Sequence, residues 1–284
     1  MASPSELTSK ETVASLLGSA GIRPSKRLGQ NFLVDRGVLD AILSEVRGRS
    51  PEQIVEIGSG LGTVTRGLAA IARRVLAIEV DARLVEILTR SVESVGNVEV
   101  RHKDILEFDL SQEIPARSAF VVGNIPYRIT APILNWLVDH RRSICGAILL
   151  TQTEVADKIV SSPGPDGSSL GVRVRAYGDA AVLRRVSRSS FYPVPDVGST
   201  LWRLEFREEP RFSAPEDSFF AVVRALYGKR RKMIRAALRD LVLPCEVGPA
   251  LEGAGIDPTV RGETLSFEEL DRLAHAVAPL LQTK

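Results

Sequence analysis

The sequence predicts an α/β domain with a mostly parallel, doubly wound sheet, followed by a small all-helical domain. Three observations predict it: β-branched apolar runs alternate with amphipathic segments up to about residue 150, a glycine-rich turn follows the first run, and only helical patterns occur after about Glu208. Apolar strands that alternate with amphipathic helices are typical of a parallel sheet covered on both faces. Ligands of such domains collect at the carboxyl ends of the strands.

Five apolar runs are the expected parallel strands. They are "QIVEIG" (53–58), "RVLAIEV" (74–80), "NVEVRH" (97–102), "AFVVGN" (119–124) and "GAILLT" (146–151). The segments between them with helical periodicity are 63–72, 82–95 and 131–140. Two later stretches have β-like composition, 179–186 and 199–206, so we expect the sheet to finish in an antiparallel pair.

The C-terminal part carries three helical patterns. They are "DSFFAVVRALY", "KRRKMIRAALRDL" and "SFEELDRLAHAV". Ser266 and Glu269 have the spacing of a capping box at the start of the last of these. We therefore expect a Rossmann-like domain over residues 1–207 and a helical domain over residues 208–284.

Composition and charge limit the class of protein. With 284 residues, of which 44% are hydrophobic, the chain can bury one large core or one large and one small core. A net charge of +2 and a pI near 8.6 indicate a nucleic-acid partner only if the basic residues cluster. Cys145 and Cys245 have neither disulfide nor metal-ligand spacing, so no metal and a reducing compartment are expected. With no signal-peptide or membrane-span pattern, we expect a soluble, cytoplasmic monomer.

The first chemical motif is the turn "EIGSGLGTVT", in which Gly58, Gly60 and Gly62 directly follow the first strand. Glycines allow a tight turn and let a ligand lie against the backbone. Glu79 ends the next strand, where a carboxylate can accept hydrogen bonds from both ribose hydroxyls of a nucleoside. A dinucleotide motif has its third glycine one place later, where this chain has Thr63. The spacing therefore favours S-adenosylmethionine over a nicotinamide cofactor.

The second motif is "GNIPYRIT" at the end of the fourth strand, beside the glycine turn. An aromatic amine keeps its lone pair conjugated into its ring, and two hydrogen-bond acceptors can turn that pair toward a methyl group. The side-chain oxygen of Asn124 and a backbone carbonyl next to Pro126 supply two acceptors, and Tyr127 can stack on the base. An Asx-Pro turn with a packed tyrosine is the alternative. Asp104, after the third strand, is either a helix N-cap or an acceptor for the adenine amino group.

In these motifs the chain resembles the ribosomal RNA adenine N6-dimethyltransferases, over about residues 24–275. "RLGQNFLVD" (27–35) resembles the family's N-terminal motif, in which Asn31 and Leu33 contact the cofactor. "EIGSGLG" resembles the family's glycine loop, with Ser59 where proline is usual. The resemblance implies these cofactor-binding residues: Asn31, Leu33, Gly58, Gly60, Glu79, Asp104 and Asn124.

The same resemblance implies how the target adenine is held. "SSFYPVPDVGST" resembles the family's Phe-x-Pro-x-Pro motif, in which an aromatic residue sandwiches the flipped base, and we assign this role to Phe191. Arg128 stands where the family usually has asparagine, so an added phosphate contact is expected there. The expected catalytic residues are Asn124, Pro126, Tyr127 and Phe191.

Two basic clusters are candidates for RNA contact. In "KRRKMIRAAL", helical spacing places one set of cations on one stripe and apolar residues on another. The cations are Lys232, Arg235 and Arg239, and the apolar residues are Met233, Ala237 and Leu241. The second cluster consists of Arg184, Arg185 and Arg188. A solvated basic face is the alternative for both.

The resemblance implies dimethylation of N6 of two adjacent adenosines in a loop near the 3′ end of 16S rRNA, in the small subunit or its precursor. One alternative is a large-subunit 23S rRNA methyltransferase that confers macrolide resistance. "GIDPTVRGETLSFEEL" favours the small-subunit enzyme. The other alternative is a non-catalytic RNA-binding assembly factor of the same fold, against which the intact acidic and "GNIPY" motifs argue.

Overall fold

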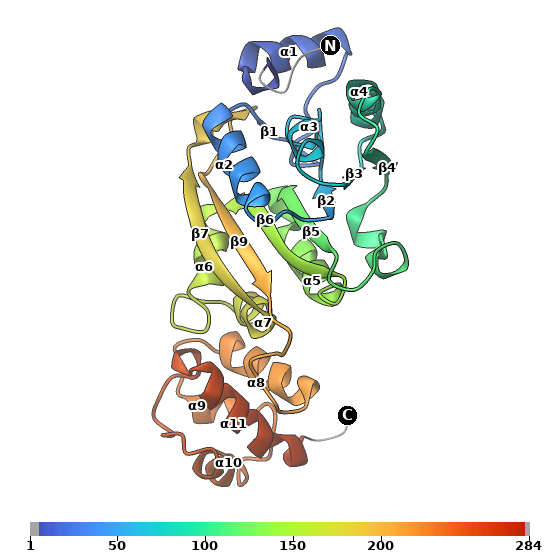
Figure 1. Ribbon diagram of the computed structural model, residues 1–284. Coiled ribbons are helices and arrows are strands. Elements are labelled where there is room, and N and C mark those ends of the chain that lie inside the picture. The colour runs from blue at the N-terminus through green and yellow to red at the C-terminus, as the bar shows by residue number, and fades with distance from the viewer. Residues whose placement is uncertain (1–5, 282–284) are drawn as a thin grey trace. The chain divides into compact units, whose positions relative to one another are not determined.

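A computed structural model describes residues 6–281 of the protein (Figure 1). The chain forms two compact units. The first contains the residues up to Ala156 together with Ala181–Phe206, and the second contains Asp157–Ala180 and the residues from Arg207 onward. The predicted division had a single boundary after residue 207, whereas Asp157–Ala180 also belongs to the second unit.

A seven-stranded sheet has the order β4-β3-β2-β5-β6-β9-β7. The pairs from β4 to β6 are parallel, and β9 is antiparallel to β6. Both predicted late strands join the sheet, with β7 beside β9. The strand bounds are β2 Gln53–Ile57, β3 Arg74–Glu79, β4 Val98–His102, β5 Ala119–Asn124, β6 Ile144–Gln152, β7 Gly178–Val186 and β9 Ser199–Phe206. A separate pair consists of β1 Phe32–Leu33 and β8 Phe191–Tyr192.

The helices of the first unit are α1 Lys10–Ser19, α2 Arg36–Arg47, α3 Thr65–Ala69, α4 Ala82–Val92 and α5 Thr130–Asp139. Helix α6 Thr153–Val160 crosses the boundary between the units, and α7 Ser169–Tyr177 belongs to the second. Short 3-10 helices are η1 Glu6–Thr8, η2 Ile105–Glu107, η3 Leu110–Gln112, η4 Tyr127–Ile129 and η5 Arg188–Ser190. The predicted set lacked α1, α2, α6 and α7. For α2 the signal was present, because Asp35 caps it by accepting a hydrogen bond from the backbone N–H of Val38 at 3.0 Å.

The strand order reverses direction between β2 and β5. The chain moves from β2 through α3 to β3 on one side, and from β5 through α5 to β6 on the other. Right-handed crossovers therefore place α3 and α5 on opposite faces of the sheet. On one face, Ile42 of α2 and Leu68 of α3 pack in a buried cluster with Ile54, Val122 and Ile148 of the strands. Because β2 and β5 end side by side at this switch point, the fold predicts a ligand site there.

The second unit has its own aromatic core. The Tyr177 ring lies 5.7 Å from that of Phe212 and 6.0 Å from that of Phe220, while Phe212 and Phe219 stack at 4.3 Å. Its C-terminal helices are α8 Glu216–Gly228, α9 Ile234–Leu238, α10 Val247–Gly253 and α11 Phe267–Val277, with short η6 Gly262–Thr264 and η7 Ala278–Leu280. The predicted capping box of Ser266 and Glu269 is confirmed.

The predicted long helix over "KRRKMIRAALRDL" is wrong. Arg231 has a left-handed backbone (φ 68°), and its N–H donates to the buried carboxylate of Glu263 at 2.9 Å. The helix α9 consequently begins only at Ile234, and Lys232 precedes it. Met233, expected on the apolar stripe, is 46% exposed. The residues that α9 buries are Ile234, Ala237 and Leu238.

In the part of the chain that the structure describes, no helix combines the length and the apolar character needed to span a bilayer.

Candidate active site

A pocket of about 220 Å³ lies in the first unit, where β2, β3 and β5 end. It is lined by the N-terminal segment before and in β1, by the glycine turn, by the end of β3 and by the end of β5. The structure thus brings together these predicted residues: Asn31, Leu33, Gly58, Gly60, Glu79, Asp104, Asn124, Pro126 and Tyr127. Segments far apart in the sequence meet here because all of them lie at the carboxyl ends of the parallel strands.

The glycine turn is held in a conformation that favours glycine. Gly58, Gly60 and Gly62 have φ values of 70°, 57° and 86°, which residues with a Cβ rarely adopt. The N–H of Gly58 donates to the carbonyl of Ile78 at 2.9 Å, which ties the turn to β3. The turn therefore presents its backbone to the pocket at a fixed position.

Glu79 joins the glycine turn to the end of β3. One carboxylate oxygen accepts from the N–H of Gly60 at 2.9 Å, and the other accepts from Val80 and Asp81, both at 2.9 Å. The side chain is only 6% exposed, and burial raises the pKa of this carboxyl despite the three backbone donors. A carboxylate has about four acceptor positions, so capacity remains for a ligand hydroxyl.

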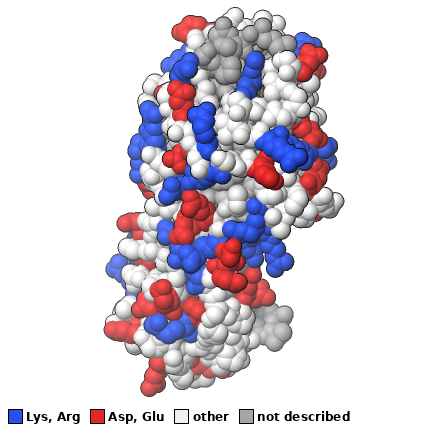
Figure 2. Space-filling model, in the orientation of Figure 1, with Lys and Arg blue, Asp and Glu red and all other residues white. Residues whose placement is uncertain are grey.

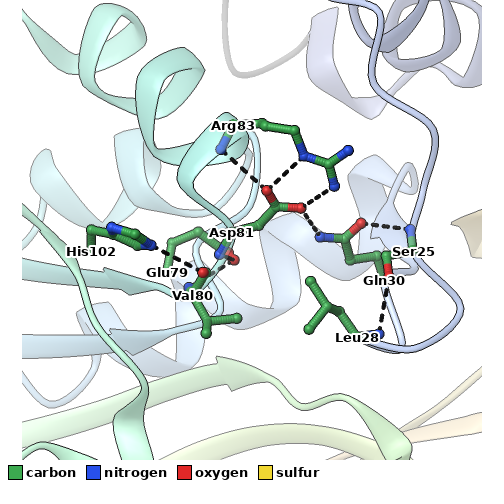
Figure 3. A network of polar contacts seen from close by, with 8 residues as sticks. All are labelled: Ser25, Leu28, Gln30, Glu79, Val80, Asp81, Arg83 and His102. Carbon is green, nitrogen blue, oxygen red and sulfur yellow. Dashed lines mark hydrogen bonds and ion pairs between the residues drawn. The ribbon is translucent and has the colours of Figure 1, made fainter.

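Gln30 connects the N-terminal segment to the loop that follows β3 (Figure 3). Its amide nitrogen donates to Asp81 at 2.9 Å, and its oxygen accepts from the N–H of Ser25 at 2.8 Å. Arg83 donates to both carboxylate oxygens of Asp81, at 2.6 Å to the oxygen that Gln30 also contacts and at 2.9 Å to the other. This interaction is the main reason that the pKa of Asp81 falls to about 2. Gln30 is missing from the predicted site, although it lies within the quoted "RLGQNFLVD", because its partner is 51 residues away.

Asn124 is oriented by the N-terminal segment. Its amide nitrogen donates to the backbone carbonyl of Asn31 at 2.8 Å, and the amide of Asn31 donates to the carbonyl of Gly29 at 3.2 Å. Because the nitrogen of Asn124 has this partner, its side-chain oxygen is the atom that remains to accept a bond in the pocket.

Pro126 and Tyr127 form the wall next to Asn124. The carbonyl of Pro126 accepts from the N–H of Ile129 at 3.1 Å and from the hydroxyl of Thr130 at 3.3 Å. Of the two carbonyls next to the proline ring, that of Ile125 is therefore the better candidate acceptor for a ligand amine. The hydroxyl of Tyr127 shares a hydrogen bond of 2.7 Å with Ser199, and burial raises its pKa. The hydroxyl end of the tyrosine ring is thus held by Ser199.

Phe191, the predicted base-stacking residue, is not among the residues that line the pocket. The ring is 1% exposed and packs in the buried cluster with Leu33, Val122 and Leu201. In the β1–β8 pair, Phe191 lies opposite Leu33, and the N–H of Val34 donates to Ser190 at 2.8 Å. Phe191 therefore anchors the N-terminal segment through this pairing, and its role in base stacking stays a prediction.

Asp104 has the first of its two predicted roles, that of a helix N-cap, and its role as acceptor for the adenine amino group stays a prediction. Its carboxylate accepts from the N–H of Leu106 at 2.9 Å, which caps η2, and the residue also lines the pocket. The cap leaves the second carboxylate oxygen for a ligand.

Glu56 is a second buried carboxyl in the pocket wall that the sequence analysis missed. It is 3% exposed and accepts a hydrogen bond of 2.6 Å from the hydroxyl of Thr65. Burial raises its pKa to about 7, and the nearby charge of Glu79 adds to the shift. Glu56 lies within the apolar run "QIVEIG", and the sequence of a strand does not show whether a carboxyl in it faces the core or the solvent.

Replacing Glu56 with glutamine should stabilise the protein at high pH. The raised pKa means that this carboxyl lowers stability progressively as pH rises from about 4.5 to about 7, and the full cost, about 3 kcal/mol, applies above that window. Urea unfolding should show a gain for Glu56→Gln over wild type that is much larger at pH 8.5 than at pH 5. Exposed Glu52→Gln is the control, and equal effects of Glu56→Gln at both pH values would contradict the buried-charge explanation.

The predicted basic residues are exposed, and several also have backbone or side-chain partners. In the first unit, Arg184 donates to the carbonyl of Gly37 at 2.8 Å, and Arg188 donates to that of Pro195 at 2.7 Å. Arg185 donates to the hydroxyl of Thr200 at 2.9 Å. In the second unit, the exposed cations are Lys232, Arg235 and Arg239. On the face drawn in Figure 2, basic and acidic side chains are interspersed.

Within the described residues, no group of three or more His, Cys, Asp and Glu side chains is arranged to hold a metal ion.

Comparison with known proteins gives a family match along nearly the whole chain. A family model described as "Ribosomal RNA adenine dimethylase" matches residues 22–277. The ribosomal RNA small subunit methyltransferase A of Anoxybacillus flavithermus is 38% identical over 278 residues, which cover 93% of this chain and 94% of that protein. The protein of the same name from Clostridioides difficile is 34% identical, over 98% of this chain and 99% of that protein.

Solved structures share the fold. The crystal structure of the 23S rRNA methyltransferase ErmE has a TM-score of 0.69 and 30% identity, and the match covers 87% of this chain and 100% of that chain. A dimethyladenosine transferase from Plasmodium falciparum has a TM-score of 0.74 over 85% of this chain and 95% of that chain, and its 22% identity supports the fold alone. The predicted α/β fold class, with its mostly parallel sheet and helical C-terminal part, is confirmed.

Proposed function

Because the chain belongs to the ribosomal RNA adenine dimethylase family, we propose that it methylates N6 of two adjacent adenosines in a loop near the 3′ end of 16S rRNA, twice each. The observation that carries the proposal is the orientation of Asn124, whose free amide oxygen lies in the same pocket as the glycine turn. The substrate would be the small ribosomal subunit or its precursor, and the enzyme would act as a cytoplasmic monomer.

The pocket fits S-adenosylmethionine. The left-handed glycines of the turn leave room for a ligand against the backbone, and Glu79 offers a buried acceptor for ribose hydroxyls. Asp104 is the proposed acceptor for the adenine amino group, while Asn31 and Leu33 also line the pocket. When bound, this cofactor supplies a methyl group that is activated for transfer by its sulfonium.

The chain's own residues would orient the target amine. The side-chain oxygen of Asn124 and the carbonyl of Ile125 accept its two N–H bonds, so that the lone pair points into the pocket. Tyr127, fixed by Ser199, provides the surface on which the base stacks. The base must leave its own stack to reach this depth, which favours a loop or another exposed RNA element. The proton of the amine can leave after transfer, so no general base is required before it.

Two observations bear on whether the small or the large subunit is the substrate. The ErmE structure, a 23S rRNA methyltransferase, has the same fold at 30% identity. The relatives named as small-subunit enzymes are 34% and 38% identical and match at least 93% of both sequences, including the C-terminal segment. The small-subunit reaction is therefore the better-supported proposal.

Mass mapping of methylated adenosines in rRNA from cells with and without the gene tests this function. Loss of dimethyladenosine from 16S rRNA in the deletion strain supports it, and loss from 23S rRNA would replace it with the large-subunit reaction. Purified protein should also transfer labelled methyl groups to under-methylated small subunits. If it bound these subunits and transferred none, a non-catalytic assembly factor would be the better explanation.

We also propose that the predicted basic clusters bind the RNA backbone. They consist of Arg184, Arg185 and Arg188 in the first unit, and of Lys232, Arg235 and Arg239 in the second. All six are exposed, as an interaction with phosphates requires.

Reversing the charge of Lys232 or of Arg235 should weaken binding to small subunits. The slope of log affinity against log salt should fall by about one for each phosphate that the variant no longer neutralises, with cofactor affinity unchanged. Filter binding of Lys232→Glu and Arg235→Glu at several salt concentrations measures this. Arg224→Glu, a reversal at an exposed position on α8 in the same unit, is the matched control. Slopes equal to that of the control would place the RNA surface elsewhere.

A further inference from the structure

The mouth of the pocket carries three cationic side chains that have no partner among the described residues. Arg27, Lys103 and Arg128 all line the pocket, and all three are exposed. None of these side chains makes a hydrogen bond or ion pair within residues 6–281. Arg83 near the same edge differs, because its charge is paired with Asp81. Side chains that carry charge at a pocket entrance without internal partners are available to an anionic ligand.

The backbone brings these cations to one place. Arg27 lies in a tight turn that closes with a hydrogen bond of 3.2 Å from the N–H of Gly29 to Lys26. A Cβ built on Gly29 would lie 3.1 Å from the Cβ of Pro126, so this turn packs against the residues directly before Arg128.

Lys103 is positioned by the end of β3. Its N–H donates to the carbonyl of Glu79 at 3.1 Å, which ties it to the strand that carries the buried carboxylate of the pocket. The three cations therefore belong to three segments that meet around one opening.

We propose that Arg128, together with Arg27 and Lys103, binds the phosphates that flank the target adenosine. This proposal rests on the proposed function. A base whose amine reaches Asn124 leaves its ribose and phosphates at the pocket mouth, and that is where the three side chains lie. The guanidinium of Arg128 suits a phosphate because it offers two parallel N–H donors and stays charged.

Arg128 follows Tyr127 in the chain, so one segment would hold both parts of the nucleotide. The tyrosine would stack on the base while the next residue holds its phosphate. Bonds that form only with the flipped nucleotide offset the cost of removing the base from its stack. Arg128 would thus stabilise the extruded base, in addition to attracting RNA to the surface.

The test compares Arg128→Asn with Arg73→Asn in the full-length enzyme. Asparagine is the residue expected at position 128 from the family resemblance, so the substitution fits the fold. Arg73 is an exposed arginine of the same unit. It lies next to the start of β3, and thus at the amino ends of the strands, away from the pocket. Binding to under-methylated small subunits is measured at several salt concentrations, with methyl transfer kinetics and S-adenosylmethionine affinity measured in parallel.

Arg128→Asn should weaken subunit binding about three- to tenfold and lower the salt slope by about 0.7–0.9, the amount expected when one phosphate is no longer neutralised. The KM for subunits should rise, with S-adenosylmethionine affinity unchanged and Arg73→Asn like wild type. Adding Arg27→Gln and Lys103→Gln should lower the slope by about 2.1–2.7 in total, the amount for three phosphates.

The failures are distinguishable. A wild-type enzyme that transfers no methyl groups would overturn the proposed function. An active wild type whose Arg128→Asn variant keeps the same affinity and salt slope would overturn the phosphate interaction alone. A variant that loses affinity for S-adenosylmethionine instead would show that Arg128 binds the cofactor, and this result would also overturn the proposal.

Discussion

Asn124→Ala is expected to lower methyl transfer by about 10²- to 10³-fold, the usual effect of deleting one pre-oriented hydrogen-bonding group in an active site. The amide nitrogen of Asn124 is already bonded to the carbonyl of Asn31, which aims its oxygen at the pocket. Without that oxygen the target amine keeps only the carbonyl of Ile125, and its lone pair returns to conjugation with the ring. Single-turnover transfer to small subunits at saturating cofactor measures the effect.

Cofactor affinity separates this role from a structural one. Asn124→Ala also removes the bond to Asn31, so a modest loss of S-adenosylmethionine affinity, within about tenfold, is expected for one hydrogen bond. Asn97→Ala is the matched control, since its amide also bonds backbone carbonyls, those of Ala69 and Ala72, outside the pocket. If the two variants turned over equally fast, the orientation of the lone pair by Asn124 would be refuted.

Much of the site was predictable because the chemistry lies where parallel strands end. Gly58, Glu79 and Asn124 each follow or end an apolar run that is readable from the sequence, and the three strands are neighbours in the sheet. In a doubly wound fold such residues meet at one edge regardless of their separation in sequence. Local pattern and known sheet geometry were sufficient for them.

The missed features depend on pairings that no local pattern encodes. Gln30 acts through Asp81, and Glu56 is recognisable only by its burial beside Thr65. Phe191 was placed in the site by its motif, yet its pairing opposite Leu33 turns the ring into the core. For Glu56 and Phe191 the outcome depends on which face of the strand each side chain occupies, and a shift of one residue reverses that.

In the second unit, too, a distant residue changes the structure that the local pattern predicts. A helical stripe over "KRRKMIRAAL" is a sound local prediction, because the segment has no proline or glycine. Glu263 overrides it from 32 residues away by holding the N–H of Arg231 in a left-handed turn. The cations of this segment are exposed as expected, but Lys232 lies in a turn and not on the helix. A tertiary hydrogen bond has here outweighed helix propensity.

Glu79→Gln should produce the second large effect, a loss of S-adenosylmethionine affinity of about 100-fold, which corresponds to about 3 kcal/mol and to the loss of two charge-assisted hydrogen bonds. The carboxylate accepts from three backbone N–H groups through both oxygens. Glutamine has one oxygen, so its NH₂ must face either Gly60 or the pair Val80 and Asp81, where donor meets donor. The glycine turn and the ribose acceptor are therefore disturbed together.

Folding stability should change much less than affinity in this variant. The carboxyl is 6% exposed with a raised pKa, so its charge already costs the folded state, and removing that charge offsets part of the lost bonding. Isothermal titration with S-adenosylmethionine and urea unfolding at pH 7.5 measure the two quantities, with exposed Glu86→Gln on α4 as the control. A Glu79→Gln protein that unfolded like wild type and bound the cofactor equally well would exclude Glu79 as the ribose acceptor. A protein that lost stability and affinity to the same degree would show that Glu79 acts on the cofactor only by supporting the turn.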